Sequence, residues 1–241
     1  MSELNTLSNS LEHTLKDSDL HNVTISLAEV FTDSLMEDSV AKDIPIIGTV
    51  IGLGKAAIGI KESLFLKKVI YFISELSDIS AVKRQEMINN INKSGKFRTK
   101  VGEKLLFIID RCDDHEKSQI IARLFSAFLL ELFSYEEFLR ASHIVDQLMN
   151  DDLKWFVESG WEKEESWKHN DHFDYEDGYL KIDEVGNIAT SGLVEIISPE
   201  IRVEDQWDRK AQDKYIVEGS ELSVRITDIG KKIKEVLKDF F

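Results

Sequence analysis

The stretch "IIARLFSAFLLELF", residues 120–133, is apolar on nearly every side when it is drawn as a helix. A helix of this kind is typical of the centre of a bundle, because only neighbours on all sides remove its surface from water. The rest of the chain suits long helices, since its 241 residues contain only two prolines, Pro45 and Pro199. The stretch therefore predicts a helical bundle that is built around residues 120–133.

Amphipathic patterns extend this prediction towards both ends of the chain. Apolar residues at spacings of three and four predict helices at residues 3–16, 22–37 and 62–77. Ser80 is expected to cap another helix. Ser134 followed by Glu137 forms a capping-box pattern, which predicts a helix beginning at residue 135 and running towards Gly160.

After about residue 160 the predicted secondary-structure elements become shorter and include strands. Residues 182–196, "IDEVGNIATSGLVEI", predict a short helix that ends in Gly192. Residues 214–227, "KYIVEGSELSVRIT", contain two alternating runs that predict a hairpin around residues 218–220. Residues 228–241, "DIGKKIKEVLKDFF", predict a terminal amphipathic helix.

Together these patterns predict a mainly α fold, a helical bundle followed by a small α+β winged-helix-like C-terminal module. The expected division is into N-terminal helices at 1–43, a bundle at 44–160 with a glycine-rich apolar helix at 44–60, an acidic linker at 161–177, and the module at 178–241.

Composition indicates a cytoplasmic protein. The formal net charge is −15, and such a charge repels nucleic acid and anionic membranes unless a local basic patch overrides it. The single cysteine, Cys112, permits no internal disulfide, which fits a reducing compartment. The first residues lack a basic segment followed by an apolar core, so no signal peptide is expected.

Residues 44–60, "IPIIGTVIGLGKAAIGI", hold four glycines among isoleucines. They do not form a phosphate-binding loop, because Gly48 precedes Gly54-Lys55 by one residue too many and Ala56 stands where the hydroxyl is needed. As a helix, the segment would place Gly48, Gly52 and Gly59 on one side, with Lys55 among them.

A glycine stripe of this kind allows close packing or conformational freedom. One interpretation of residues 44–60 is a buried core helix. The other is an element that leaves the bundle for peripheral contact with the inner membrane, since the segment is shorter than the roughly twenty apolar residues of a spanning helix.

The sequence contains few candidates for metal-ligating or catalytic residues. His169, His172 and Asp174 are candidate metal ligands, with a solvated acidic loop as the competing interpretation. The spacing of residues along the chain does not identify a catalytic set of nucleophile, histidine and acid. We therefore expect no catalytic residues and no cofactor. Cys112 lacks the electropositive neighbours that would activate its thiol.

Two basic stretches are candidates for contact with an anionic surface, with solvated helix faces as the alternative. The first consists of Lys93, Lys96, Arg98, Lys100 and Lys104, and the second of Lys231, Lys232, Lys234 and Lys238. The helix that would enter DNA in a winged-helix module carries Asp183 and Glu184 and no basic residue. Nucleic acid is therefore not expected to be a partner.

Four segments resemble the Abi-alpha-type bacterial domain family, which is associated by name with phage abortive infection. They are "CDDHEKSQIIARLFSAFL", "EEFLRASHIVDQLMNDDLKWF", "ATSGLVEI" and "LSVRITDIGKKIKEVL", which together cover roughly residues 100–240. The resemblance implies a helical protein with a degenerate winged helix at its end, in a mobile-element or defence setting. It implies no mechanism and no site residue.

These observations favour a non-enzymatic bacterial defence-associated or accessory protein. It would act through protein–protein contacts with a partner or with a second copy, with possible membrane engagement through residues 44–60. Two alternatives from other classes are a winged-helix DNA-binding regulator and a metal-dependent enzyme that uses the His169 and His172 region.

Overall fold

The structure is a computed structural model of the chain. It describes residues 3–20, 44–53, 59–159, 180–181, 185–198, 202–205, 215–218 and 222–241. The described residues are mainly helical, with nine α-helices, as the sequence predicts. Contacts divide the chain into two compact units, Met1–Asp146 and Gln147–Asp239, and each is considered by itself.

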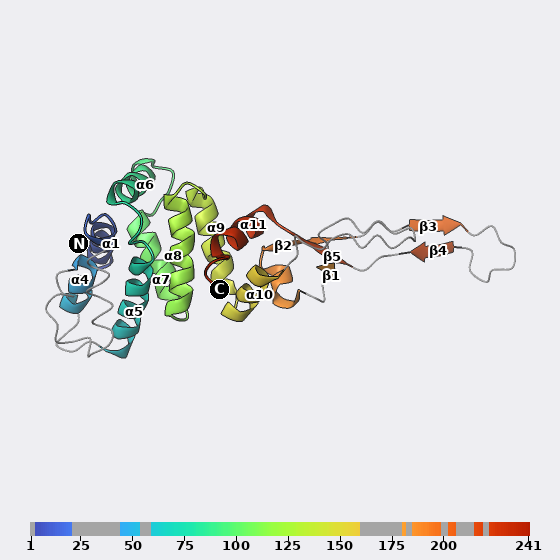
Figure 1. Cartoon of the computed structure of the whole chain (residues 1–241), viewed down its shortest axis with the longest axis horizontal. Coiled ribbons are helices and arrows are strands. Elements are labelled where there is room, and N and C mark those ends of the chain that lie inside the picture. The colour runs from blue at the N-terminus through green and yellow to red at the C-terminus, as the bar shows by residue number, and fades with distance from the viewer. Residues whose placement is uncertain are drawn as a thin grey trace. The chain divides into compact units, whose positions relative to one another are not determined.

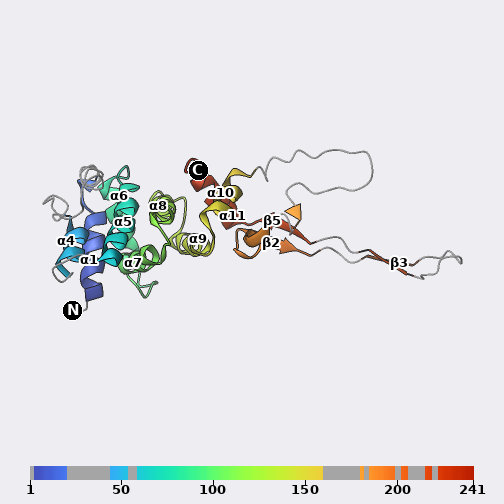
Figure 2. The same ribbon diagram turned by 90° about the horizontal axis from the view of Figure 1, so that it is seen from below.

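Seven of the described helices belong to the first unit, and Figure 1 labels them. They are α1 (Glu3–Leu15), α4 (Pro45–Leu53), α5 (Ile60–Ser74), α6 (Ala81–Lys93), α7 (Val101–Arg111), α8 (His115–Leu129) and α9 (Tyr135–Gln147). Helix α1 packs against α4 and α7, and α5 packs against α8 and α7. Figure 2 shows the same helices from below.

Helix α8 is the central helix that residues 120–133 predict. Ten of its fifteen residues are buried. The ring of Phe125 lies 5.8 Å from that of Phe72 on α5 and 5.2 Å from that of Phe138 on α9. The helix ends at Leu129, and Glu131 adopts a left-handed φ of 63°. Leu130 and Leu132 therefore lie outside the helix and are exposed.

Both predicted helix caps are present. The Ser80 hydroxyl accepts a hydrogen bond from the Lys83 amide at the start of α6. At α9 the capping box is reciprocal, since the Glu137 amide donates to Ser134 Oγ at 3.2 Å and the Ser134 amide donates to Glu137 Oε2 at 2.7 Å. The long helix predicted after Ser134 is interrupted, because Met149 is extended. The predicted helix at 22–37 lies outside the described residues.

Glu12 is a buried carboxylate that joins α1 to α6 and α7. Its Oε1 accepts a hydrogen bond from the Gly102 amide at 3.0 Å, and its Oε2 accepts from Asn92 Nδ2 at 2.9 Å and from Lys16 Nζ at 3.1 Å. Gly102 is required here, because an added Cβ would lie 2.5 Å from Glu12 Cγ and 2.6 Å from the Ser8 carbonyl oxygen. The absence of a side chain thus lets the N-terminus of α7 reach this carboxylate.

Arg84 is the largest fully buried side chain of the described residues. Its guanidinium donates to the carbonyl oxygens of Leu15 at 2.7 Å and Leu76 at 3.2 Å, and also to those of Asp17 and Ile79. These carbonyls follow α1 and α5, where a helix leaves its last acceptors unpaired and attracts a cation. Arg84 on α6 therefore supplies hydrogen-bond donors to carbonyl oxygens at the C-terminal ends of two other helices.

The second unit combines helices with short strands. Its elements are α10 (Asn150–Glu158), β1 (Leu180–Lys181), a 3-10 helix η2 (Gly186–Thr190), β2 (Val194–Ile197), β3 (Arg202–Asp205), β4 (Tyr215–Glu218), β5 (Ser223–Ile226) and α11 (Asp228–Leu237). Helix α10 packs against α11 and η2. The boundary between the units therefore precedes α10, earlier than the expected position near residue 160.

The strand pairing differs from the predicted hairpin. The two alternating runs do form strands β4 and β5, but β5 pairs with β1 and β2, whereas β4 pairs with β3. The β2–β5 ladder pairs Ile197 with Ser223, and the β3–β4 ladder pairs Arg202 with Glu218. The two ladders are in the same register, because Ile197 and Arg202 are separated by as many residues as Glu218 and Ser223. β4 and β5 therefore do not pair with each other, and the hairpin predicted around residues 218–220 is wrong.

The motifs "SGL" and "TDIG" meet where β5 ends and α11 begins. The Thr227 hydroxyl lies 2.9 Å from the Gly192 carbonyl oxygen and accepts a hydrogen bond from the Gly230 amide at 3.0 Å. The Thr227 amide donates to the Leu193 carbonyl at 2.9 Å. Gly192 has a φ of 95°, and a Cβ on Gly230 would overlap the Leu193 carbonyl oxygen. Both glycines are thus required by the backbone.

Candidate functional site

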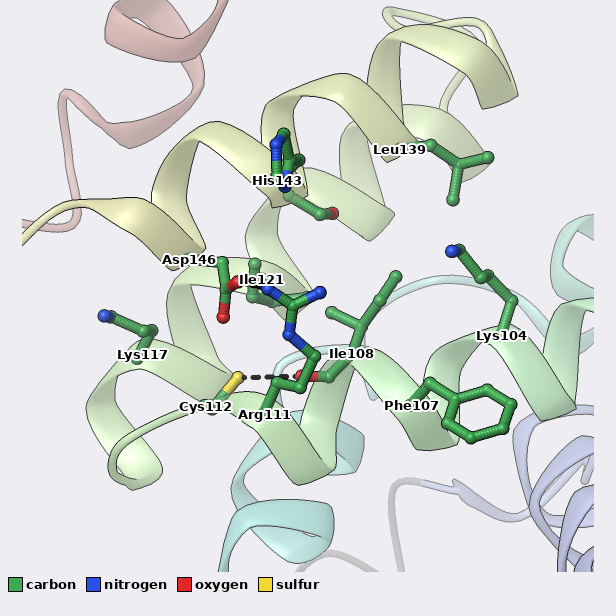
Figure 3. Close-up of a pocket in the computed structure, with 11 residues that line it drawn as sticks. Lys104, Phe107, Ile108, Arg111, Cys112, Lys117, Ile121, Leu139, His143 and Asp146 are labelled. Carbon is green, nitrogen blue, oxygen red and sulfur yellow. Dashed lines mark hydrogen bonds and ion pairs between the residues drawn. The ribbon is translucent and has the colours of Figure 1, made fainter. Parts of the chain in front are cut away.

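A groove of about 170 Å³ lies between α7, α8 and α9 in the first unit (Figure 3). Helix α7 lines it with Lys104, Phe107, Ile108 and Arg111, and α9 lines it with Leu139, Ser142, His143 and Asp146. Each set follows the spacing i, i+3, i+4, i+7, which places its members on one helical face. Two helices therefore turn mixed polar and apolar faces towards the same space.

The deeper polar groups of the groove come from Cys112, Lys117 and Ser142. Ser142 is only 2% exposed, and its hydroxyl has no hydrogen-bond partner among the described residues. Lys117 is 3% exposed, and its ammonium pairs with Asp113 Oδ2 at 2.7 Å. Cys112 Sγ donates weakly to the Ile108 carbonyl at 3.3 Å.

Burial raises the pKa of the Cys112 thiol to about 12, although the charges of Lys68 and Lys117 act in the opposite direction. The thiol is therefore protonated at neutral pH and is not an activated nucleophile. Hydrogen bonding to Lys117 lowers the pKa of Asp113, whose carboxylate lies at the surface.

Positive charge exceeds negative charge at the groove. Lys104, Arg111 and Lys117 contribute three cations, and Asp146 is the only carboxylate among the described residues that line this groove. Asp146 pairs with Arg111, and Asp113 from outside the groove pairs with Lys117. Lys104 has no ion-pair partner among the described residues. The groove thus has one uncompensated positive charge in a protein whose net charge is −15.

The residues of the first predicted basic stretch, at positions 93–104, do not all lie on one surface. Lys104 lines the groove, whereas Lys96 pairs with Glu136 on α9 at 2.8 Å and lies 5.7 Å from the ring of Phe97. Lys93, Arg98 and Lys100 are exposed. Sequence reasoning thus found one groove residue of eleven. The matching spacing on residues 104–111 and 139–146 is the signal that could have indicated the others.

Only part of the glycine-rich segment lies on one helix. Helix α4 buries Ile46, Ile47 and Val50 and ends, within the described residues, at Leu53. Gly59 is the extended residue before α5, so the expected face shared by Gly48, Gly52 and Gly59 is wrong. The described atoms leave the space around Gly52 open, since a Cβ there would have none within 4 Å. Close packing against the described residues therefore does not explain Gly52.

Apolar side chains are exposed where α4 ends and α5 begins. Leu53 is 41% exposed, Ile60 is 82% exposed and Leu64 is 57% exposed. Ile60 and Leu64 are four residues apart on α5 and share one face of its first turn. We refer to Leu53, Ile60 and Leu64 as the apolar patch.

Several predicted positions lie outside the described residues, namely Lys55, His169, His172 and Asp174. Within the described residues, no three His, Cys, Asp or Glu side chains are placed to hold a metal ion. None of the described helices combines the length and apolar character needed to cross a membrane.

The terminal basic stretch lies on and just after α11. Lys231 and Lys238 are exposed, and Lys234 Nζ donates to the Ser159 carbonyl oxygen. The predicted recognition helix is the five-residue 3-10 helix η2, which is shorter than two α-helical turns.

Comparison with known proteins gives no relative. No protein-family model matches the chain, and no curated protein or solved structure is similar to it. The resemblance to the Abi-alpha-type domain therefore rests on the motifs quoted above.

Proposed function

We propose that this chain is a non-enzymatic, defence-associated or accessory bacterial protein that acts through protein–protein contacts, and that the apolar patch is its contact surface. The observation that carries the proposal is the exposure of Leu53, Ile60 and Leu64 beside a helix without any charged residue, α4. Large aliphatic side chains that gather at the surface mark interaction sites more often than isolated ones do.

The charge of the chain favours protein over an anionic membrane as the occupant of this patch. A protein with a net charge of −15 is repelled by acidic lipid, whereas contact between apolar residues needs no opposite charge. We propose that a second copy of the chain is the first partner, because a two-fold interface can bury the same patch on both copies.

Sedimentation velocity over a range of concentrations tests this proposal. We expect wild type to associate, and to associate more strongly at high salt, which screens repulsion between two acidic copies. The double variant Ile60→Glu/Leu64→Glu should remain monomeric. Val82→Glu is the matched control, because Val82 is also an aliphatic residue in the first turn of a helix and is 74% exposed.

Two results would contradict the contact surface. The first is association that survives the double variant, and the second is association that Val82→Glu abolishes equally. Co-sedimentation with neutral and anionic vesicles distinguishes the membrane interpretation. Monomeric wild type that pellets with vesicles, when the double variant does not, would instead assign the apolar patch to a lipid surface.

A phage challenge tests the proposed defence role. Bacteria that express the chain are challenged with phage beside bacteria that lack it and bacteria that express the double variant. We expect protection by wild type and its loss with the double variant. Equal phage yields in all three cultures would remove the defence part of the proposal and leave the contact surface to the sedimentation result.

A further inference from the structure

The groove between α7, α8 and α9 has the features of a built binding site. Its volume of about 170 Å³ is close to the roughly 150 Å³ of an engineered apolar cavity that holds one benzene molecule. Ile108 on α7, Ile121 on α8 and Leu139 on α9 supply apolar walls from three different helices. The groove therefore has room for an apolar body of about one ring.

The Ser142 hydroxyl provides an independent reason to expect a ligand. Ser142 is one of the residues that line the groove, and its hydroxyl is buried and lacks a hydrogen-bond partner among the described residues. Serine in a helix commonly bonds to the carbonyl of its own preceding turn, as Ser126 does with Ala122 on α8. Ser142 does not, and a buried hydroxyl without a partner costs free energy that a bound acceptor would recover.

The charges around the groove define the ligand's charge. Asp146 compensates Arg111 and Asp113 compensates Lys117, which leaves the charge of Lys104 for a ligand. Figure 3 shows Lys104, Ile108, Arg111 and Leu139 arranged around one opening. One uncompensated cation fits a monoanion better than a dianion, and a carboxylate can accept hydrogen bonds from an ammonium, a guanidinium and a hydroxyl together.

We propose that this groove binds a small monocarboxylate with a single-ring apolar body. The carboxylate lies between Lys104 and Arg111 and accepts a hydrogen bond from Ser142 Oγ, and the ring packs against Ile108, Ile121 and Leu139. The site is independent of the apolar patch, because the two share no residue.

Ligand-observed NMR titration of the full chain tests the site with benzoate as the probe. Benzyl alcohol, which has the same ring without the charge, and benzylammonium, which has the opposite charge, are the comparison probes. We expect saturable binding of benzoate, weaker binding of benzyl alcohol and none of benzylammonium. The absence of saturable benzoate binding up to millimolar concentrations would overturn the proposal.

Substitutions locate the binding. Lys104→Gln should weaken benzoate binding about tenfold, and Ser142→Ala should weaken it by about threefold to tenfold, while leaving benzyl alcohol less affected. Lys100→Gln is the matched control, because Lys100 is exposed, lies one turn earlier and does not line the groove. Leu139→Trp should fill the groove and abolish binding. Benzoate affinity that is unchanged in Lys104→Gln and Leu139→Trp would place the ligand elsewhere and contradict the assignment.

Discussion

At the scale of single residues, buried charges on α1 and α6 hold the first unit together. Burial by itself raises the pKa of Glu12, but hydrogen bonds from Gly102, Asn92 and Lys16 outweigh burial and hold the pKa below its ordinary value of 4.5. A carboxyl group whose pKa is lower in the folded state stabilises that state above its unfolded pKa. The contribution is lost as the pH falls through the folded-state pKa.

This argument predicts a pH-dependent effect of Glu12→Gln. At neutral pH the variant should lose about 2 kcal/mol of unfolding free energy, because the amide replaces a charged acceptor that serves several donors. The difference from wild type should shrink as the pH falls through the folded-state pKa of Glu12, because the wild-type carboxyl is then also protonated. Urea unfolding at a series of pH values from neutral to acidic measures it. Glu3→Gln, an exposed position on α1, is the control, and a difference that stays constant with pH would contradict the argument.

At the scale of elements, two helical glycines have opposite roles. Gly230 on α11 lies against the Leu193 carbonyl, whereas a Cβ added to Gly52 on α4 would have no described atom within 4 Å. We expect Gly230→Ala to lower the unfolding free energy by about 2–3 kcal/mol, because a methyl group must displace backbone. Gly52→Ala should instead raise it by up to about 1 kcal/mol, since alanine favours the helix.

Denaturant unfolding of the two variants beside wild type measures both effects. The pair also tests the earlier expectation that glycine at position 52 serves close packing. A Gly52→Ala variant that loses stability would restore that expectation, and a neutral Gly230→Ala variant would show that α11 can shift away from Leu193.

At the scale of the whole molecule, net charge governs the response to polyanions. With a charge of −15, and with Lys234 already bonded to the Ser159 carbonyl, the chain should not retain double-stranded DNA in a gel shift at physiological salt. The short helix η2 gives the same expectation, because groove readers present a longer helix. A shift that weakens with salt and disappears on neutralising Lys231, Lys232 and Lys234 would instead support the regulator hypothesis.

Sequence reasoning predicted most of the helical part because its signals are local. A capping box spans four residues, and the amphipathic period repeats within two turns, so Ser134, Glu137 and the centre of α8 could be interpreted without knowing their neighbours. The sequence shows Gly192 and Gly230 only as parts of motifs. The structure explains why glycine is needed at each position, because Gly192 has a positive φ and Gly230 lies close to Leu193.

The sequence by itself therefore determined a mainly helical protein, its central helix and several of its helix ends. Tertiary structure decided that β4 and β5 pair with different strands, that Ile60 and Leu64 are exposed, and that residues of α7 and α9 share a groove. The physical reason is the range of the interactions. Helical hydrogen bonds join residues four apart, whereas strand pairing, burial and cavities depend on which distant segments meet.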